Sequence, residues 1–291
     1  MNALIKSFPL NPRQNFRQEL TLSTIQQRLS YKHEVSFTTP HVLEFYALVL
    51  VNEGEYRHVL DFKEYHIKAG DLFLISPNQI HYFLDLEGFD GYIITFSENF
   101  LKDYFIQFNP TIRYELLYEF YVVKKITLED FTREQFIRTY YLLLSELKRD
   151  FDPNQKTILQ NLLSVVLHNI CREFRKENLI SKIELNNTYI DFKDALSKKI
   201  NYKYNVKYYA DELKVSVRAL QMITKKHTNK TPKELIDDNL ILECKRQLLN
   251  TNTLIQDAAF NLGFDDPSAF TKYFKKNAGL TPNEFKKIYV L

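Results

Sequence analysis

The chain has 291 residues, 45% of them hydrophobic and 14% aromatic, and a formal net charge of only +3. This composition supplies enough apolar surface to bury a core, which excludes a chain that is disordered throughout, and the length favours two domains. Two cysteines without CxxC spacing provide neither a disulfide framework nor a zinc site. The longest apolar run, 45–51, is too short to span a bilayer. We therefore expect a cytoplasmic protein that is neither secreted nor inserted in a membrane.

Short segments rich in β-branched and aromatic residues follow one another between residues 45 and 97. Glycines and other turn residues separate them, at a spacing typical of an antiparallel sandwich or a small barrel. The pattern predicts strands at 45–51, 56–62, 65–69, 71–76, 81–86 and 92–97.

Helical periodicity replaces this pattern in the next part of the chain. From residue 128 to 176 the apolar residues recur every three or four positions, which predicts two amphipathic helices that form a hairpin. Asp152 is the expected N-cap of the second helix, with Pro153 at the first helical position. The weaker periodicity of 177–187 indicates a linker.

The last hundred residues contain an internal repeat. Residues 210–215 match 259–264 at an offset of 49, and residues 220–235 match 270–285 at an offset of 50. Each copy predicts a short helix, a tight turn at Lys214 or Gly263, and a second helix, which is the spacing of a helix-turn-helix.

Capping residues recur at equivalent places in the two copies. Ser216 and Asp266 are suited to cap the second helices, and Asn229 and Gly279 tolerate the left-handed backbone that ends them. Thr-Pro-x-Glu follows both times, at 231–234 and 281–284, and predicts a capping box with proline at N1.

A single predicted helix, from Pro232 to about Leu249, joins the two copies. Its length would be about 27 Å, so it could hold two recognition helices roughly one turn of DNA, ~34 Å, apart. The charge distribution agrees with a DNA-facing role. Residues 188–291 contain 18 Lys and Arg against 12 Asp and Glu, net +6, whereas the preceding 187 residues contain 21 against 24, net −3.

The segment LIQDAAFNLGFDDPSAFTKYFKKNAGLTPNEFKK, residues 254–287, closely resembles the signature of the AraC/XylS family of transcription regulators. The resemblance covers 189–291 and implies the seven-helix, double helix-turn-helix DNA-binding domain of that family. The first copy departs from the family pattern, because Thr224 stands where an apolar aromatic is common and Asn229 where glycine is common.

The exposed face of each second helix, over about 216–228 and 267–277, is expected to enter a major groove. The predicted base-contacting residues are Arg218, Gln221, Met222, Lys225, Ser268, Thr271 and Lys272, and the predicted phosphate contacts are Ser216, Lys226, Lys275 and Lys276. Arg218 suits a guanine edge and Gln221 an adenine, whereas the hydroxyls of the second copy are less selective. The alternative is that the lysines form an ordinary solvated face.

The segment GDLFLISPNQIH, residues 70–81, resembles the second motif of the cupin-like domain that precedes this DNA-binding domain in many family members. The metal-binding first motif is missing near 56–59, so we expect no metal, no cofactor and no catalytic residue. The resemblance implies an effector sensor, and the residues expected to line its chamber are Tyr46, Tyr56, Arg57, His58, Phe73, His81 and Tyr82. Core packing would also explain these aromatic residues.

The predicted chain is therefore multidomain, with an N-terminal cupin-like β-barrel and helical hairpin and a C-terminal all-α double helix-turn-helix. The expected parts are a sensor at 1–127, a hairpin for dimerisation at 128–176, a linker at 177–188 and a DNA-binding domain at 189–291. The expected partners are double-stranded DNA, a small-molecule effector, a second copy of the chain and, by family resemblance, RNA polymerase.

The predicted function is that of a transcription regulator, most readily an effector-responsive activator. Two alternatives stay open. A metal-dependent cupin enzyme with an appended DNA-binding module would need a metal triad. A constitutive DNA-binding protein would need no effector.

Overall fold

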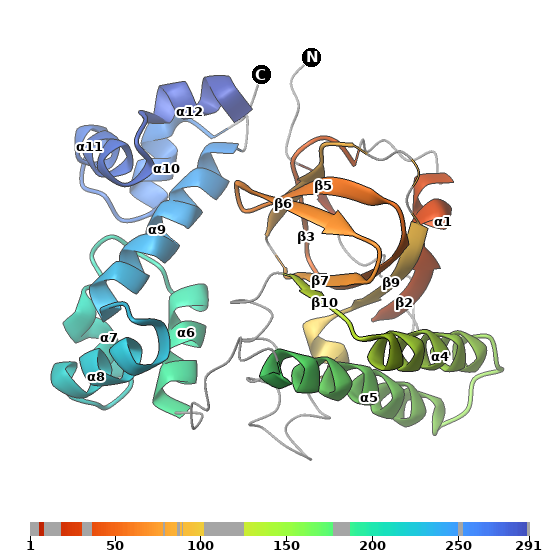
Figure 1. The fold of residues 1–291 in the computed structure, drawn as a ribbon. Helices are drawn as coiled ribbons and strands as arrows, with labels where there is room; N and C mark the ends of the chain where they lie inside the picture. Colours follow the sequence, from red (N-terminus) through yellow and green to blue (C-terminus); the bar gives the residue numbers. More distant parts are fainter. Residues whose placement is uncertain are drawn as a thin grey trace. The chain divides into compact units, whose positions relative to one another are not determined.

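The computed structural model describes residues 6–8, 19–30, 37–77, 79–85, 88, 90–101, 125–176, 187–249 and 253–289. They fall into two compact units, one within Lys6–Lys182 and one within Ile183–Leu291. The first unit combines β-sheets with a helical hairpin, and the second is helical (Figure 1). This confirms the predicted fold class.

The first unit contains two sheets of five described strands each, paired antiparallel except for β1 and β3. One sheet has the order β1 (Lys6–Phe8), β3 (His41–Leu43), β8 (Ile80–Phe83), β5 (Glu55–Leu60) and β6 (Lys63–Lys68). The other has the order β10 (Lys125–Thr127), β7 (Asp71–Ile75), β4 (Tyr46–Glu53), β9 (Asp90–Phe96) and β2 (Leu20–Thr24). The six predicted strands are present, with ends shifted by a few residues.

Strand β4 shows why the second sheet is buried on both faces. Successive side chains of a strand point to opposite faces. Val49 and Val51 accordingly pack in the core between the sheets, whereas Leu48 and Leu50 belong to the core under the helical hairpin. A continuous apolar run, rather than an alternating one, is the expected signature of such a strand.

The hairpin consists of α4 (Asp130–Leu147) and α5 (Gln155–Lys176), which lie together beside the β10–β7–β4 sheet (Figure 1). The expected helix start at Pro153 is wrong, because α5 begins at Gln155. The Asp152 carboxylate accepts a hydrogen bond from the Asn154 amide at 2.7 Å and so closes a turn ahead of the helix. A short helix, α1 (Ile25–Ser30), follows β2.

The second unit contains α6 (Asn187–Lys198), α7 (Val206–Glu212), α8 (Val217–Thr228), α9 (Pro232–Leu249), α10 (Ile255–Asn261), α11 (Pro267–Ala278) and α12 (Pro282–Tyr289). Helices α7 and α8 form one helix-turn-helix, α10 and α11 form the other, and α9 joins them (Figure 1). Most of the predicted linker lies outside the described residues, and its last two positions already belong to α6.

The predicted turns and caps of both copies are confirmed. Lys214 and Gly263 have φ of 56° and 82°, and Asn229 and Gly279 have φ of 56° and 80°. Both capping boxes form, since the Thr231 and Thr281 amides donate to the glutamates three residues later at 2.6 and 2.7 Å. These bonds satisfy amides that a helix start leaves without intrahelical partners.

Among the described residues, no helix is long and apolar enough to cross a membrane.

Candidate nucleic-acid interface and histidine cluster

Helix α8 presents the predicted base-contacting residues of the first copy on a single face. The Ser216 hydroxyl caps the helix by accepting a hydrogen bond from the Ala219 amide at 3.1 Å. Leu220 and Thr224 are fully buried, so the side of the helix that carries them packs into the core. The exposed residues at the i, i+3, i+4 and i+7 positions are Arg218, Gln221, Met222 and Lys225.

Helix α11 repeats this arrangement in the second copy. The Asp266 carboxylate accepts hydrogen bonds from the Ser268 and Ala269 amides, both at 2.8 Å, and Pro267 occupies the first turn. Phe270 and Phe274 are fully buried. The opposite face carries Ser268, Thr271, Lys272 and Lys275.

Two predicted contact residues also bond within their own helices. The Thr271 hydroxyl, on a half-buried side chain, donates to the Pro267 carbonyl at 2.8 Å, which leaves it an acceptor for DNA. The Lys225 ammonium donates to the Asn229 carbonyl at 3.0 Å and keeps two further protons. Thr271 thus has no proton left to donate to DNA, whereas Lys225 still has two.

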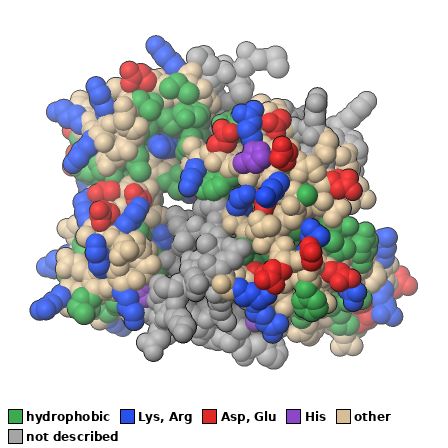
Figure 2. All heavy atoms as spheres, viewed as in Figure 1, with side chains coloured by type: hydrophobic (Ala, Val, Ile, Leu, Met, Phe, Trp, Pro, Cys, Tyr) green, Lys and Arg blue, Asp and Glu red, His purple; other side chains and the backbone are tan. Residues whose placement is uncertain are grey.

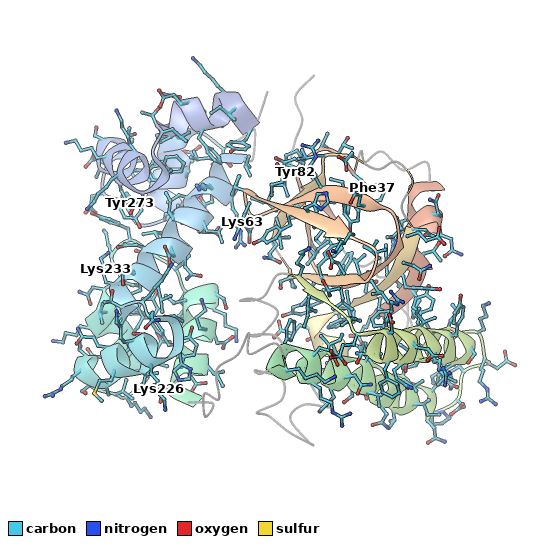
Figure 3. All side chains as sticks on the ribbon, viewed as in Figure 1. Phe37, Lys63, Tyr82, Lys226, Lys233 and Tyr273 are labelled. Carbon is cyan, nitrogen blue, oxygen red and sulfur yellow. The ribbon has the colours of Figure 1, made fainter. Side chains whose placement is uncertain are left out.

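The lysines of the recognition helices differ from two lysines near the start of α9. Lys226, Lys272, Lys275 and Lys276 are exposed and form no ion pair with any other described residue. Lys230 and Lys233, near the start of α9, instead pair with Asp238 and Asp237 at 2.6 Å. Figure 2 shows Lys and Arg side chains on the surface over α8 and α11, and Lys226 is labelled in Figure 3. Uncompensated cations on an exposed helix face suit DNA phosphates.

In the β-unit the structure brings together four of the seven predicted chamber residues. Tyr56, His58, Phe73 and His81 are at most 3% exposed and lie in the interior between the sheets. Their ring centroids are 4.9 Å apart for His58 and Phe73, 5.5 Å for His58 and His81, and 6.3 Å for Tyr56 and Phe73.

The other three lie elsewhere. Tyr46 stacks on Phe96 and packs against the core beneath the hairpin. Arg57 is exposed and binds Asp85, with 3.1 Å between Nε and Oδ2. Tyr82 alternates with His81 along β8, so its side chain faces away from the interior.

His41, which was not among the predicted chamber residues, completes a cluster of three buried histidines. The pairing of β3 with β8 sets His41 opposite His81, and their ring centroids lie 4.0 Å apart. His58 Nε2 and His81 Nδ1 are 3.3 Å apart, whereas His81 Nε2 has no hydrogen-bond partner among the described residues. The signal was a histidine at the start of the strand run, five residues before Tyr46, the first position that was considered.

Burial keeps these histidines neutral. Together with the neighbouring histidines, it lowers the pKa of His58 to about 3 and that of His81 well below the usual value. Burial also lowers the pKa of His41, although its hydrogen bond to the Thr39 carbonyl opposes the shift. The cluster therefore offers neutral donors and acceptors. Within the described ranges, no group of three His, Cys, Asp or Glu residues is arranged to hold a metal ion.

Comparison with known proteins finds two family matches. Residues 27–163 match the AraC-like ligand binding domain, and residues 209–288 match a helix-turn-helix domain. The transcriptional activator RhaS of Pectobacterium carotovorum is 22% identical over 254 residues, which are 84% of this chain and 86% of that protein.

Two further similarities concern part of the sequence and the fold. The uncharacterized regulator YobQ of Bacillus subtilis is 36% identical over 62 residues, 21% of this chain and 26% of its own. Among solved structures, ToxT from Vibrio cholerae aligns with 93% of this chain and 99% of its own, at 14% identity and a TM-score of 0.46.

The two family matches follow one another along the chain and fall in its two structural units. The chain therefore belongs to the AraC/XylS family, whose members are effector-responsive, DNA-binding transcription regulators.

Proposed function

We propose that this protein activates transcription from specific promoters by inserting α8 and α11 into successive major grooves, under the control of a small molecule bound by the β-unit. The carrying observation is the pair of separately capped helices, each of which exposes one polar face with lysines that form no ion pair with a described carboxylate. Helix α9, of 18 residues, is about 27 Å long and suits recognition helices about one DNA turn apart.

The division of labour between the helices follows from their side chains. Arg218 and Gln221 can make bidentate contacts to guanine and adenine, with Met222 and Lys225 beside them, whereas Ser268, Thr271 and Lys272 give α11 weaker selectivity. Phosphates would be held by Ser216, Lys226, Lys275 and Lys276. The first copy would then determine most of the sequence preference.

The effector is proposed to bind at the cluster of Tyr56, His58, Phe73 and His81. This placement is supported by His81 Nε2, which is buried without a hydrogen-bond partner among the described residues and would accept or donate one bond to a polar ligand. The chain is proposed to act by binding rather than by catalysis.

The proposal also includes activation of transcription and assembly into a homodimer. The RhaS proteins among the relatives are named transcriptional activators, which favours activation and a contact with RNA polymerase. A homodimer is proposed because α5 exposes apolar side chains, Ile158 and Val165 among them. A DNA partner implies that the protein acts in the cytoplasm.

The decisive experiment is selection of bound duplexes from a randomised library by the full-length protein, with and without sugars, aromatic acids and fatty acids. We expect a bipartite site whose halves lie about one helical turn apart. Identical sites and affinities under all conditions would favour the constitutive alternative.

The selected duplex should also bind with a steep dependence on salt. Three phosphate-binding lysines predict a slope of about −3 or steeper in a plot of log K against log salt. A flat plot would contradict the proposed phosphate contacts.

A further inference from the structure

The loop between α6 and α7, residues 199–205, belongs to the first half of the helical unit but packs on the second helix-turn-helix. Tyr202 stacks on Phe264, with ring centroids 4.0 Å apart and planes inclined by 20°. Its backbone amide donates to the Leu262 carbonyl at 2.8 Å. Both partners lie in the turn between α10 and α11, so the contact reaches the element that aims the second recognition helix.

The neighbours of Tyr202 extend the contact on both sides. Lys203 Nζ lies 2.6 Å from the Asp265 carboxylate. A Cβ built on Gly263 would collide with the side-chain amide of Asn201. Three consecutive loop residues therefore touch the same turn, and the closeness of one of them depends on glycine at 263.

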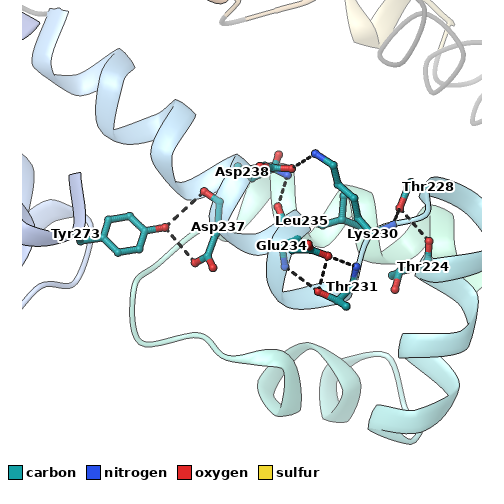
Figure 4. Close-up of polar contacts among 10 residues, drawn as sticks. Thr224, Thr228, Lys230, Thr231, Glu234, Leu235, Asp237, Asp238 and Tyr273 are labelled. Carbon is teal, nitrogen blue, oxygen red and sulfur yellow. Dashed lines mark hydrogen bonds and ion pairs between the residues drawn. The ribbon is translucent and has the colours of Figure 1, made fainter. Parts of the chain in front are cut away.

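Tyr273 of α11 connects this contact to the joining helix. Its ring makes an edge contact with Tyr202, with centroids 5.5 Å apart. Its hydroxyl donates to the Asp237 carboxylate of α9 at 3.1 Å (Figure 4). Lys233 donates to the same carboxylate oxygen at 2.6 Å. Burial and the carboxylate raise the pKa of Tyr273, so the hydroxyl keeps its proton and remains a donor.

We propose that loop 199–205 and Tyr273 form a second connection between the two helix-turn-helix units, beside α9, which fixes the separation and angle of α8 and α11 and thereby the half-site spacing that the protein accepts. Tyr202 and Tyr273 are positioning residues, because they act through the placement of α11. The inference rests on the proposed insertion of both recognition helices into DNA.

The physical basis is the coupling of two linked binding events. Once one helix-turn-helix is bound, the other meets its half-site at an effective concentration set by the geometry of the connection. A rigid connection raises this concentration at one spacing and lowers it at all others. Loosening the connection should weaken binding at the preferred spacing and relax the penalty at neighbouring spacings.

The test compares full-length wild type with Tyr202→Ala and Tyr273→Phe. The probes are the duplex selected by wild type, the same duplex with one base pair inserted between the half-sites, and a duplex with the second half-site scrambled. The spacing penalty is the factor by which the inserted base pair weakens binding. Tyr202→Ala should bind the selected duplex about tenfold more weakly and show a spacing penalty about tenfold smaller. Tyr273→Phe should shift both quantities in the same direction by about threefold. Affinity for the single half-site should stay unchanged.

Tyr204→Ala is the matched control. Tyr204 lies in the same loop, but its ring contacts Tyr208 and Tyr209 of α7, with centroids 3.9 and 6.3 Å away, rather than the turn between α10 and α11. Its loss should therefore leave the spacing penalty at the wild-type value. Tyr273→Phe removes only a hydroxyl and keeps the test valid if Tyr202→Ala unfolds.

Two results would overturn the inference while leaving two-groove binding intact: an unchanged spacing penalty in both variants, or an equal loss of affinity for all three duplexes. If wild type bound duplexes of different half-site spacing equally well, both this inference and the proposed two-groove binding would be overturned.

Discussion

His58 and His81 lie within hydrogen-bonding distance in the interior of the β-unit, where burial favours the neutral form of both rings. A protonated imidazole at either position would lose its hydration and meet a second ring at close range. The cost is electrostatic, because burial and the neighbouring histidines both oppose a positive charge on these rings. The cluster is thus stable at neutral pH and vulnerable to acid.

The first prediction is that acid destabilises the β-unit through these histidines. The folded-state pKa of His58, about 3, lies below the unfolded value of 6.5, so the unfolded state binds more protons between these values. Stability is present above pH 6.5 and is lost as the pH falls towards 3, by a few kcal/mol in total.

Chemical unfolding of wild type and His58→Asn between pH 7 and 4 would measure this effect. The difference in unfolding free energy between the two proteins should shrink as the pH falls. His66→Asn, at an exposed position, is the control and should follow wild type. A difference that is constant with pH would contradict the prediction.

The second prediction concerns Arg218, which is exposed on α8. Arg218→Ala should relax selectivity at one base pair of the site and cost about 1 to 3 kcal/mol of binding free energy, because a bidentate contact to a guanine edge is lost. Lys226→Ala is the comparison and should weaken binding to all sequences alike. A uniform loss with Arg218→Ala would reassign this residue to a phosphate.

At the scale of elements, the two helix-turn-helix copies use different residues for the same backbone conformation. Lys214 and Gly263 both have positive φ in the turns, and so do Asn229 and Gly279 at the ends of α8 and α11. Conformation alone therefore does not require glycine at these positions. Gly263 differs from the rest because Asn201 occupies the space of its missing side chain.

The third prediction follows from that difference. Gly279→Ala should cost about 1 kcal/mol of stability, since its φ is unfavourable for alanine but no atom lies within 4 Å of the new Cβ. Gly263→Ala should cost clearly more, because it must also displace Asn201 from the turn. Thermal unfolding followed by far-UV circular dichroism would compare the two, and equal costs would contradict the role given to Asn201.

Local signals made the helical unit predictable. Caps such as Asp266, turns such as Lys214 and the apolar period act within a few residues, so the sequence alone places them. The side of the sheet on which Tyr46 lies could not be predicted in this way, because β4 is buried on both sides. Only the packing of the hairpin shows which side chains of β4 face the hairpin and which face the other sheet. His41 was missed for the same reason, since the pairing of β3 with β8 joins residues forty positions apart.

At the scale of the whole molecule, α5 presents two apolar faces. Leu159 and Val166 are buried against the sheet, whereas Ile158 and Val165 are 38% and 50% exposed. Core packing accounts for Leu159 and Val166 but gives Ile158 and Val165 no role inside the β-unit. A second copy of the chain would cover it, as the proposed homodimer requires.

The fourth prediction is that Val165→Glu weakens this dimer. A buried carboxylate without a partner should raise the dissociation constant of the dimer at least about tenfold, as measured by sedimentation equilibrium of the full-length protein. Ile288→Glu, at a 64% exposed apolar position of α12, is the control and should leave the dimer intact. Identical sedimentation of Val165→Glu and wild type would place the dimer contact elsewhere.

Thr224 of α8 occupies the position that Phe274 occupies in α11, and both are fully buried. Among the described residues, the Thr224 hydroxyl bonds only to its own helix, at the Gln221 carbonyl. Its small side chain buries less apolar surface than a phenyl ring. The first helix-turn-helix therefore has the weaker core of the two, and its amide hydrogens should exchange with deuterium faster than those of α11. The copy proposed to be the more selective is then also expected to open more easily, so DNA should slow exchange in α8 more than in α11.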